Sequence, residues 1–124
     1  MLGADSARRR HREWRGRISE LVAAVLLLLK GYRILAWRHR SPFGEIDLIA
    51  VRGRRLAFVE VKLRPTLDQA EAAKTRRQAD RLYRAAGHWV WRHVGYRGHE
   101  IGLDAVLILP RQWPRHQPNA LQPA

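Results

Sequence analysis

Residues 44–64, with the sequence GEIDLIAVRGRRLAFVEVKLR, constrain the fold more than any other stretch of the chain. Two apolar runs rich in Ile, Val and Phe flank a short turn of Arg and Gly, which is typical of a β-hairpin. Gly53 fits the first position of a two-residue turn, because glycine readily adopts the positive φ angle required there. The sequence therefore predicts two antiparallel strands over residues 46–51 and 56–63.

The predicted register brings charged side chains together. With the turn centred immediately after Gly53, Asp47 faces Glu60 across the hairpin. Glu45 then faces Lys62, and strand alternation puts these side chains on one face. Two opposed carboxylates repel by about 3 kcal/mol at an effective dielectric of ~20, so a shared proton or a divalent cation would stabilise them. The alternative is a surface hairpin with a Glu–Lys pair, although the flanking residues are apolar for a solvated edge.

The chain carries 24 Lys and Arg residues against 11 Asp and Glu residues, so its net charge is +13 with neutral His. This excess indicates a polyanionic partner, with nucleic acid the first candidate and an acidic membrane surface the second. An Arg-rich proteome, in which Arg only solubilises the protein, is the alternative. The lack of Cys excludes disulfides, thiolate metal sites and a Cys nucleophile.

The 124 residues suit one domain, which we place at residues 13–110. A basic N-terminal arm over residues 1–12 precedes it, and a flexible tail over residues 111–124 follows it. No secretory signal is visible, and the apolar run at residues 21–29 is too short to span a bilayer. We therefore expect a cytoplasmic protein without a membrane partner.

Apolar residues at three- and four-residue steps predict helices over residues 13–30 and 68–93. Gly87 is the weak position of the second helix. Gln78 is a polar residue on its inner stripe and needs a partner there. Trp91, on the opposite side, either stacks on a base or is an ordinary exposed Trp.

Two further strands are predicted, YRILAW at residues 32–37 and an apolar run at residues 102–109. A basic loop at residues 38–42 follows the first of them. The order helix, three strands, helix, strand predicts an α/β fold with a mixed central sheet flanked by helices. The second helix would join the strand of Glu60 to that of Asp104 in parallel.

Basic side chains form a ridge on the second helix that is suited to a phosphate backbone, or else is simply a solvated surface. With neighbouring loop residues, the predicted nucleic-acid contacts are Arg38, Arg40, Arg64, Lys74, Arg77, Arg81 and Arg84.

The hairpin supplies the predicted metal ligands, the carboxylates of Asp47 and Glu60 and the carbonyl of Val61. Lys62 would position a water molecule or balance negative charge on a phosphodiester. Glu20 lies on the first helix, either at the flank of its buried stripe or aimed at the same site.

The motifs GYRIL at residues 31–35, GEIDLIA at 44–50 and FVEVK at 58–62 resemble the bacterial YraN family, whose fold is endonuclease-like. The resemblance covers roughly residues 16–109. Arg38 departs from it, since the family usually has Asn there. The family in turn resembles PD-(D/E)xK nucleases, especially archaeal Holliday-junction resolvases.

By position, the resemblance implies a restriction-endonuclease-like domain with Glu20, Asp47, Glu60 and Lys62 as its site and Gln78 as an accessory. It implies Mg²⁺- or Mn²⁺-dependent hydrolysis of DNA, including branched DNA, and it allows a homodimer. A nucleic-acid-binding module of the same fold without turnover is the alternative. A third reading is an interaction protein whose charge only solubilises it.

Overall fold

The computed structural model describes the backbone of residues 2–123 and the side chains of residues 6–10 and 16–123. In chain order its elements are α1 (Leu2–Leu29), β1 (Arg33–Ser41), β2 (Gly44–Arg52), β3 (Arg55–Leu63), α2 (Leu67–Ala72), α3 (Arg76–Arg92), the 3₁₀ turn η1 (Val94–Tyr96), β4 (Glu100–Ile108) and β5 (Arg115–Gln117). This order confirms the predicted α/β class, with the second helix divided in two and one strand added at the end.

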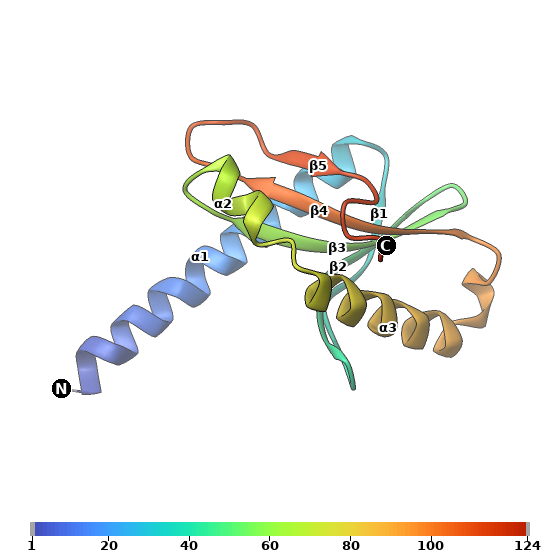
Figure 1. The fold of residues 1–124 in the computed structure, drawn as a ribbon, viewed down its shortest axis with the longest axis horizontal. Coiled ribbons are helices and arrows are strands. Elements are labelled where there is room, and N and C mark those ends of the chain that lie inside the picture. Colours follow the sequence, from blue (N-terminus) through green and yellow to red (C-terminus); the bar gives the residue numbers. More distant parts are fainter. Residues whose placement is uncertain (1, 124) are drawn as a thin grey trace.

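Five strands form one mixed sheet in the order β1-β2-β3-β4-β5 (Figure 1). Strands β3 and β4 are parallel, whereas the other neighbouring pairs are antiparallel. A parallel pair needs a crossover connection, and the segment containing α2 and α3 supplies it. The predicted parallel pairing is therefore confirmed, and the layout is consistent with the restriction-endonuclease-like class.

The hairpin between β2 and β3 has the predicted register. Gly53 opens its turn with a φ angle of +58°, which favours glycine. Leu48 pairs with Val59 and Ile49 with Phe58, as the predicted turn position requires. The paired residues end at Leu48, one position short of Asp47.

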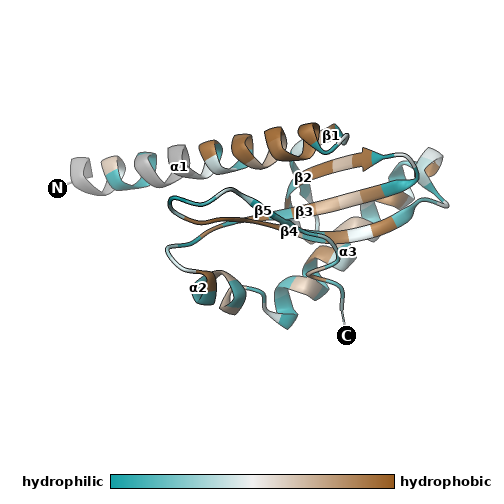
Figure 2. Ribbon diagram, turned by 90° about the horizontal axis from the view of Figure 1, so that it is seen from above, coloured by the Kyte–Doolittle hydropathy of each residue, from teal (hydrophilic) through white to brown (hydrophobic). Residues whose placement is uncertain are grey.

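Helices cover both faces of the sheet, with α1 on one side and α2 and α3 on the other (Figure 2). Alternate strand residues point to opposite faces, so the central strands contribute side chains to a hydrophobic core on each face of the sheet. On the α1 side the buried core residues are Ala23, Ala24, Leu27, Tyr32, Leu48, Ala50, Ala57, Val59 and Val106. On the α3 side the large buried residues include Ile49, Leu56, Phe58, Leu82, Trp89, Leu103 and Leu107.

The predicted start of the first helix was wrong. α1 begins at Leu2 instead of residue 13, and its first half extends past the sheet (Figure 1). This segment is rich in Arg and Ala, which favour helix without an apolar stripe, so apolar periodicity could not reveal it.

The prediction of one helix over residues 68–93 was also wrong, because the chain breaks it at residues 73–75. Thr75 is extended and its hydroxyl accepts a hydrogen bond from the Gln78 amide, which starts α3 as a separate capped helix. Gly87, the expected weak position, lies inside α3.

Two predicted loops contain strand. The basic segment at residues 38–42 continues β1 as far as Ser41, because an edge strand tolerates polar residues. The tail, predicted to be mostly unstructured, contributes β5, which pairs with β4, and the buried Leu121. A hydrogen bond between His116 of β5 and the buried Asp104 of β4 holds this segment, with 2.8 Å between Nε2 and Oδ2.

Among the residues that the structure describes, no helix is both long enough and apolar enough to traverse a lipid bilayer. The predicted cytoplasmic location stays a prediction.

Candidate functional site

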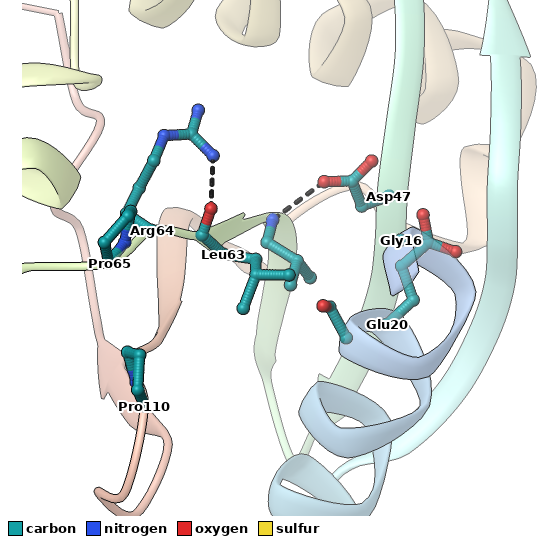
Figure 3. Close-up of a pocket in the computed structure, with 9 residues that line it drawn as sticks. Gly16, Glu20, Asp47, Leu63, Arg64, Pro65 and Pro110 are labelled. Atoms are coloured by element: carbon teal, nitrogen blue, oxygen red, sulfur yellow. Dashed lines mark hydrogen bonds between the residues drawn. The ribbon is translucent and has the colours of Figure 1, made fainter. Parts of the chain in front are cut away.

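The candidate site lies where β2 and β3 separate. At this fork, Asp47 Oδ2 accepts a hydrogen bond of 2.7 Å from the Val61 amide, so a side chain replaces a strand partner. Asp47 faces a pocket of about 590 Å³ between α1 and the end of β3 (Figure 3). The pocket is lined by Gly16, Ser19, Glu20, Asp47, Val61, Leu63, Arg64, Pro65 and Pro110.

Three carboxylates lie close together here, and two of them, Glu20 and Asp47, line the pocket. One oxygen each from Glu20, Glu45 and Asp47 lies within 4.8 Å of the others. Burial raises the pKa of Asp47 to about 7, and the negative charges of Glu60, Glu20 and Glu45 add to the rise. Close carboxylates of this kind are stabilised by a proton or by a cation.

Glu20 is held at the pocket by two residues of β1. Its Oε2 lies 2.5 Å from Arg38 Nε and accepts a hydrogen bond of 3.1 Å from the Trp37 indole. The hydrogen bond to Glu20 raises the pKa of Arg38. The prediction that Glu20 is aimed at the same patch as Asp47, and not only at the flank of the helix, is therefore consistent with the geometry.

Glu60 and Lys62 alternate with Val61, so their side chains lie toward α3. Glu60 is buried, and its Oε1 lies 2.8 Å from Arg81 Nη2. Lys62 is also buried and donates a hydrogen bond of 2.5 Å to Gln78 Oε1, which is the partner that Gln78 was expected to need. Burial lowers the pKa of Lys62, while Glu60 and Asp47 oppose this shift.

Arg81 joins the two sides of the site. Besides its ion pair with Glu60, it donates a hydrogen bond of 3.0 Å to the carbonyl of Glu45. Gly44 makes this approach feasible, because its φ angle is +118° and a Cβ there would lie 2.7 Å from the guanidinium. Arg81 is thus bound to the acidic residues, and its predicted phosphate contact would require it to leave them.

The other predicted nucleic-acid contacts are distributed over several surfaces. Arg64 lines the pocket, and Arg40 is exposed with its Nε 3.9 Å from Glu45. Lys74 pairs with Glu71 at 2.7 Å, whereas Arg77 and Arg84 are exposed on α3. Arg38, like Arg81, is paired with an acid.

The predicted site residues fall into two groups that meet at Asp47. Glu20 and Val61 share its pocket, whereas Glu60 and Lys62 contact α3 from the neighbouring strand. Glu45 was missing from the predicted ligands, although its two-residue spacing from Asp47 already placed both on one face.

The donor set fits a hard divalent cation. Mg²⁺ and Mn²⁺ prefer oxygen ligands, and three carboxylate oxygens converge here. The pKa of Asp47 is raised first by burial and then by the neighbouring carboxylates, so its ionised form lacks a compensating partner charge of its own. Glu20, Glu45 and Asp47 are the residues that would hold the ion, and the predicted catalytic roles stay predictions.

Comparison with known sequences assigns the chain to a family. A UPF0102 protein of Methylorubrum extorquens (strain PA1) is 51% identical over 116 residues, covering 94% of this chain and 91% of that protein. A UPF0102 protein of Nitrobacter winogradskyi is 50% identical over 101 residues, covering 82% and 86%. The sequence pattern of the family itself matches residues 19–108, which include the strands of the fork and Glu20. The chain therefore belongs to the Uncharacterised protein family UPF0102, which confirms the resemblance to the YraN family.

Proposed function

We propose that this protein is a Mg²⁺- or Mn²⁺-dependent endonuclease that hydrolyses phosphodiester bonds in DNA, including branched DNA. The observation that carries the proposal is the convergence of one oxygen each from Glu20, Glu45 and Asp47 within 4.8 Å, beside a pocket that Glu20 and Asp47 line. A buried Lys and a further Glu on the adjacent strand complete a set of groups suited to phosphodiester hydrolysis.

In this proposal Glu20, Glu45 and Asp47 would hold the metal ion, with Glu60 and the Val61 carbonyl as the remaining candidate ligands. The bound ion would stabilise negative charge on the phosphodiester and lower the pKa of a water molecule. The proton on Asp47 would compete with the metal ion, so the raised pKa of Asp47 would make metal binding weaker as the pH falls below about 7.

Lys62 would balance negative charge as it develops on the phosphate. Its burial and its hydrogen bond to Gln78 fix the ammonium group in place, so little reorganisation is needed when charge appears. Gln78 therefore acts as a positioning residue in this proposal.

The proposed DNA partner rests on charge. The chain has a net charge of +13, and most of its basic residues are Arg, which binds phosphate through a bidentate fork. Arg64 lies at the pocket itself, where it would contact the scissile strand.

The test is a cleavage panel with linear duplex, nicked, flapped and four-way-junction DNA, single strands and RNA, each with Mg²⁺, Mn²⁺ or EDTA. We expect metal-dependent cleavage of at least one DNA shape and its loss in Asp47→Asn and Lys62→Ala, with DNA binding retained. Asp80→Asn is the matched control, because Asp80 is an exposed acid on α3. Equal cleavage by the parent and both site variants would exclude the assigned site.

A binding module without turnover is the second candidate. The pairing of Arg38 with Glu20 and of Arg81 with Glu60 favours it, because these contacts neutralise acids without a metal ion. This candidate predicts no cleavage on the whole panel, together with salt-sensitive binding. About six phosphate contacts would weaken affinity ~10³-fold between 50 and 200 mM salt.

A further inference from the structure

A second cavity lies along α3, and none of the described residues that line it is acidic. Its volume is about 710 Å³, and its lining is largely aromatic and apolar. Trp91 is 68% exposed, Tyr83 60% and Phe43 40%, although large aromatic side chains are usually buried. We call this cavity the aromatic groove; its lining residues are Phe43, Tyr83, Arg84, Ala86, Gly87, His88, Val90, Trp91, Ile101 and Gln122.

Gly87 forms an open floor in the aromatic groove. It follows Tyr83 by four residues and precedes Trp91 by four, so the three share one side of α3. Tyr83 and Trp91 are about 12 Å apart along the helix axis. A Cβ added at Gly87 would meet no described atom within 4 Å. Glycine weakens a helix interior, and close packing within the chain does not explain its presence here.

The aromatic rings are held in place by contacts with one another. The Phe43 and His88 rings are 6.1 Å apart at 66°, and the His88 and Trp91 rings are 6.1 Å apart at 43°. Phe43 comes from the turn between β1 and β2, so two separate segments fix the wall of the aromatic groove. Rings that already contact one another, as Phe43, His88 and Trp91 do, lose less conformational freedom when a flat ligand stacks on them.

Charge identifies the class of ligand. Arg84 lines the aromatic groove, and Arg92 is exposed one turn beyond His88. A second copy of this chain would bring another +13 against this surface, whereas a nucleic-acid strand would bring negative charge. Exposed aromatic rings beside Arg are the combination that binds unpaired bases by stacking and their phosphates by charge.

We propose that unpaired bases of a DNA strand stack on Trp91 and Tyr83 in the aromatic groove, with their phosphates directed to Arg84 and Arg92. The inference rests on the proposed function and deepens it, because it defines the substrate as DNA that exposes unpaired bases beside a duplex. Arg81 lies on the same helix and contacts Glu60, so α3 links the aromatic groove to the carboxylates.

The test measures binding of the full chain in EDTA, where no cleavage can interfere. The probes are a fluorescent thymidine oligonucleotide and an abasic oligomer of equal length, which has the same phosphates without bases. The parent should bind the thymidine oligomer roughly 5- to 150-fold more tightly than the abasic one. Trp91→Ala should lower this ratio several-fold and leave abasic binding unchanged, the remainder being due to Tyr83, whereas Trp91→Phe should largely restore it.

Two further variants make the test specific. Gly87→Leu fills the floor of the aromatic groove while every ring remains, and it should reduce the ratio as Trp91→Ala does. Trp113→Ala is the control, because Trp113 is 90% exposed and lies outside the lining of the aromatic groove. Circular dichroism confirms that each variant is folded.

The inference is overturned if Trp91→Ala leaves the ratio unchanged or weakens both oligomers equally. It is also overturned if Trp91→Ala changes only the sedimentation of the protein, which would make the aromatic groove a contact between copies. A protein that retains the base-dependent ratio but cleaves no substrate supports this inference and contradicts the nuclease proposal.

Discussion

Replacing Asp47 with Asn should stabilise the metal-free protein at pH 8, although it removes the acid at the centre of the site. Burial, and after it the charge of Glu60, raises the pKa of this carboxyl to about 7. At pH 8 the side chain is therefore ionised in surroundings that disfavour its charge. Asn has nearly the same shape, and its carbonyl oxygen can still accept the hydrogen bond from Val61.

The magnitude follows from the difference between the ordinary pKa of 3.8 and the value of about 7 in the folded protein. At 1.36 kcal/mol per pKa unit, ionised Asp47 costs at most about 4 kcal/mol. Solvent screening and the weaker hydrogen bond of Asn reduce the expected gain to about 2 kcal/mol. A gain of this size raises the Tm by roughly 5–10 °C in a chain of this length.

The pH dependence has a definite sign. Because the pKa is raised on folding, the parent protein loses stability as pH rises from about 3.8 to about 7 and then reaches a plateau. Asp47→Asn removes this titration, so the two stability curves should separate over that interval and stay apart above it.

Urea denaturation at pH 4, 6 and 8 in EDTA measures the effect, with Asp80→Asn as the control for replacing an exposed acid. Adding Mn²⁺ should then stabilise the parent and leave Asp47→Asn unchanged, because a bound ion stabilises only the state that holds it. A variant that is no more stable than the parent at pH 8, or a difference that does not depend on pH, would refute this reasoning.

Two other substitutions test the fold. Burial alone would raise the pKa of Asp104, but hydrogen bonds from Arg55, His116 and the Asn119 amide outweigh it and lower that pKa to about 2. Its contribution of about 2 kcal/mol is present above pH 3.8 and lost as pH falls toward 2. Asp104→Asn should cost about 3 kcal/mol in urea denaturation at pH 7, because half-buried Arg55 loses its charged partner, and clearly less at pH 2; an equal cost at both pH values would contradict this. Thr75→Ala removes the cap of α3 and should cost about 1 kcal/mol in the same assay, and no change would argue against two separate helices.

The sequence carried enough information to predict the centre of the sheet. A two-residue turn at Gly53 and strict alternation fix the hairpin register, since a shift of one residue would turn the apolar side chains of β2 away from the core. An apolar strand after a long helix implied a buried parallel neighbour. The turn at Gly53 and the apolar run of the last predicted strand are local patterns, but each determines how a whole strand pairs with its neighbour.

Local sequence patterns did not predict the break between α2 and α3 or the strand β5. Residues 68–75 favour helix by composition, and only Thr75, a residue that caps helices well, indicated a new start. β5 depends on the contact of His116 with Asp104, which lies on a different strand. A buried acid such as Asp104 needs a partner, but the apolar run at residues 102–109 contains nothing that identifies it.

The geometry of the candidate site depends on one irregular position in the sheet, where Arg38 of β1 lies opposite Asp47 of β2. The pairing of β1 with β2 passes from Trp37 and Leu48 to His39 and Ile46, so Arg38 is level with Asp47. Arg38 has a φ of +51°, which costs free energy for a residue with a Cβ.

This irregularity coincides with the separation of β2 from β3, which frees the Asp47 carboxylate to bind the Val61 amide. It also accompanies the contact of Arg38 with Glu20 at the same pocket. A regular ladder would have kept Asp47 on the face shared with Glu60, as the alternation predicted. At this irregular position Asp47 instead lies close to Glu20 of α1. Ideal strand geometry therefore predicted the residues of the site, but it did not predict the group of three carboxylates formed by Glu20, Glu45 and Asp47.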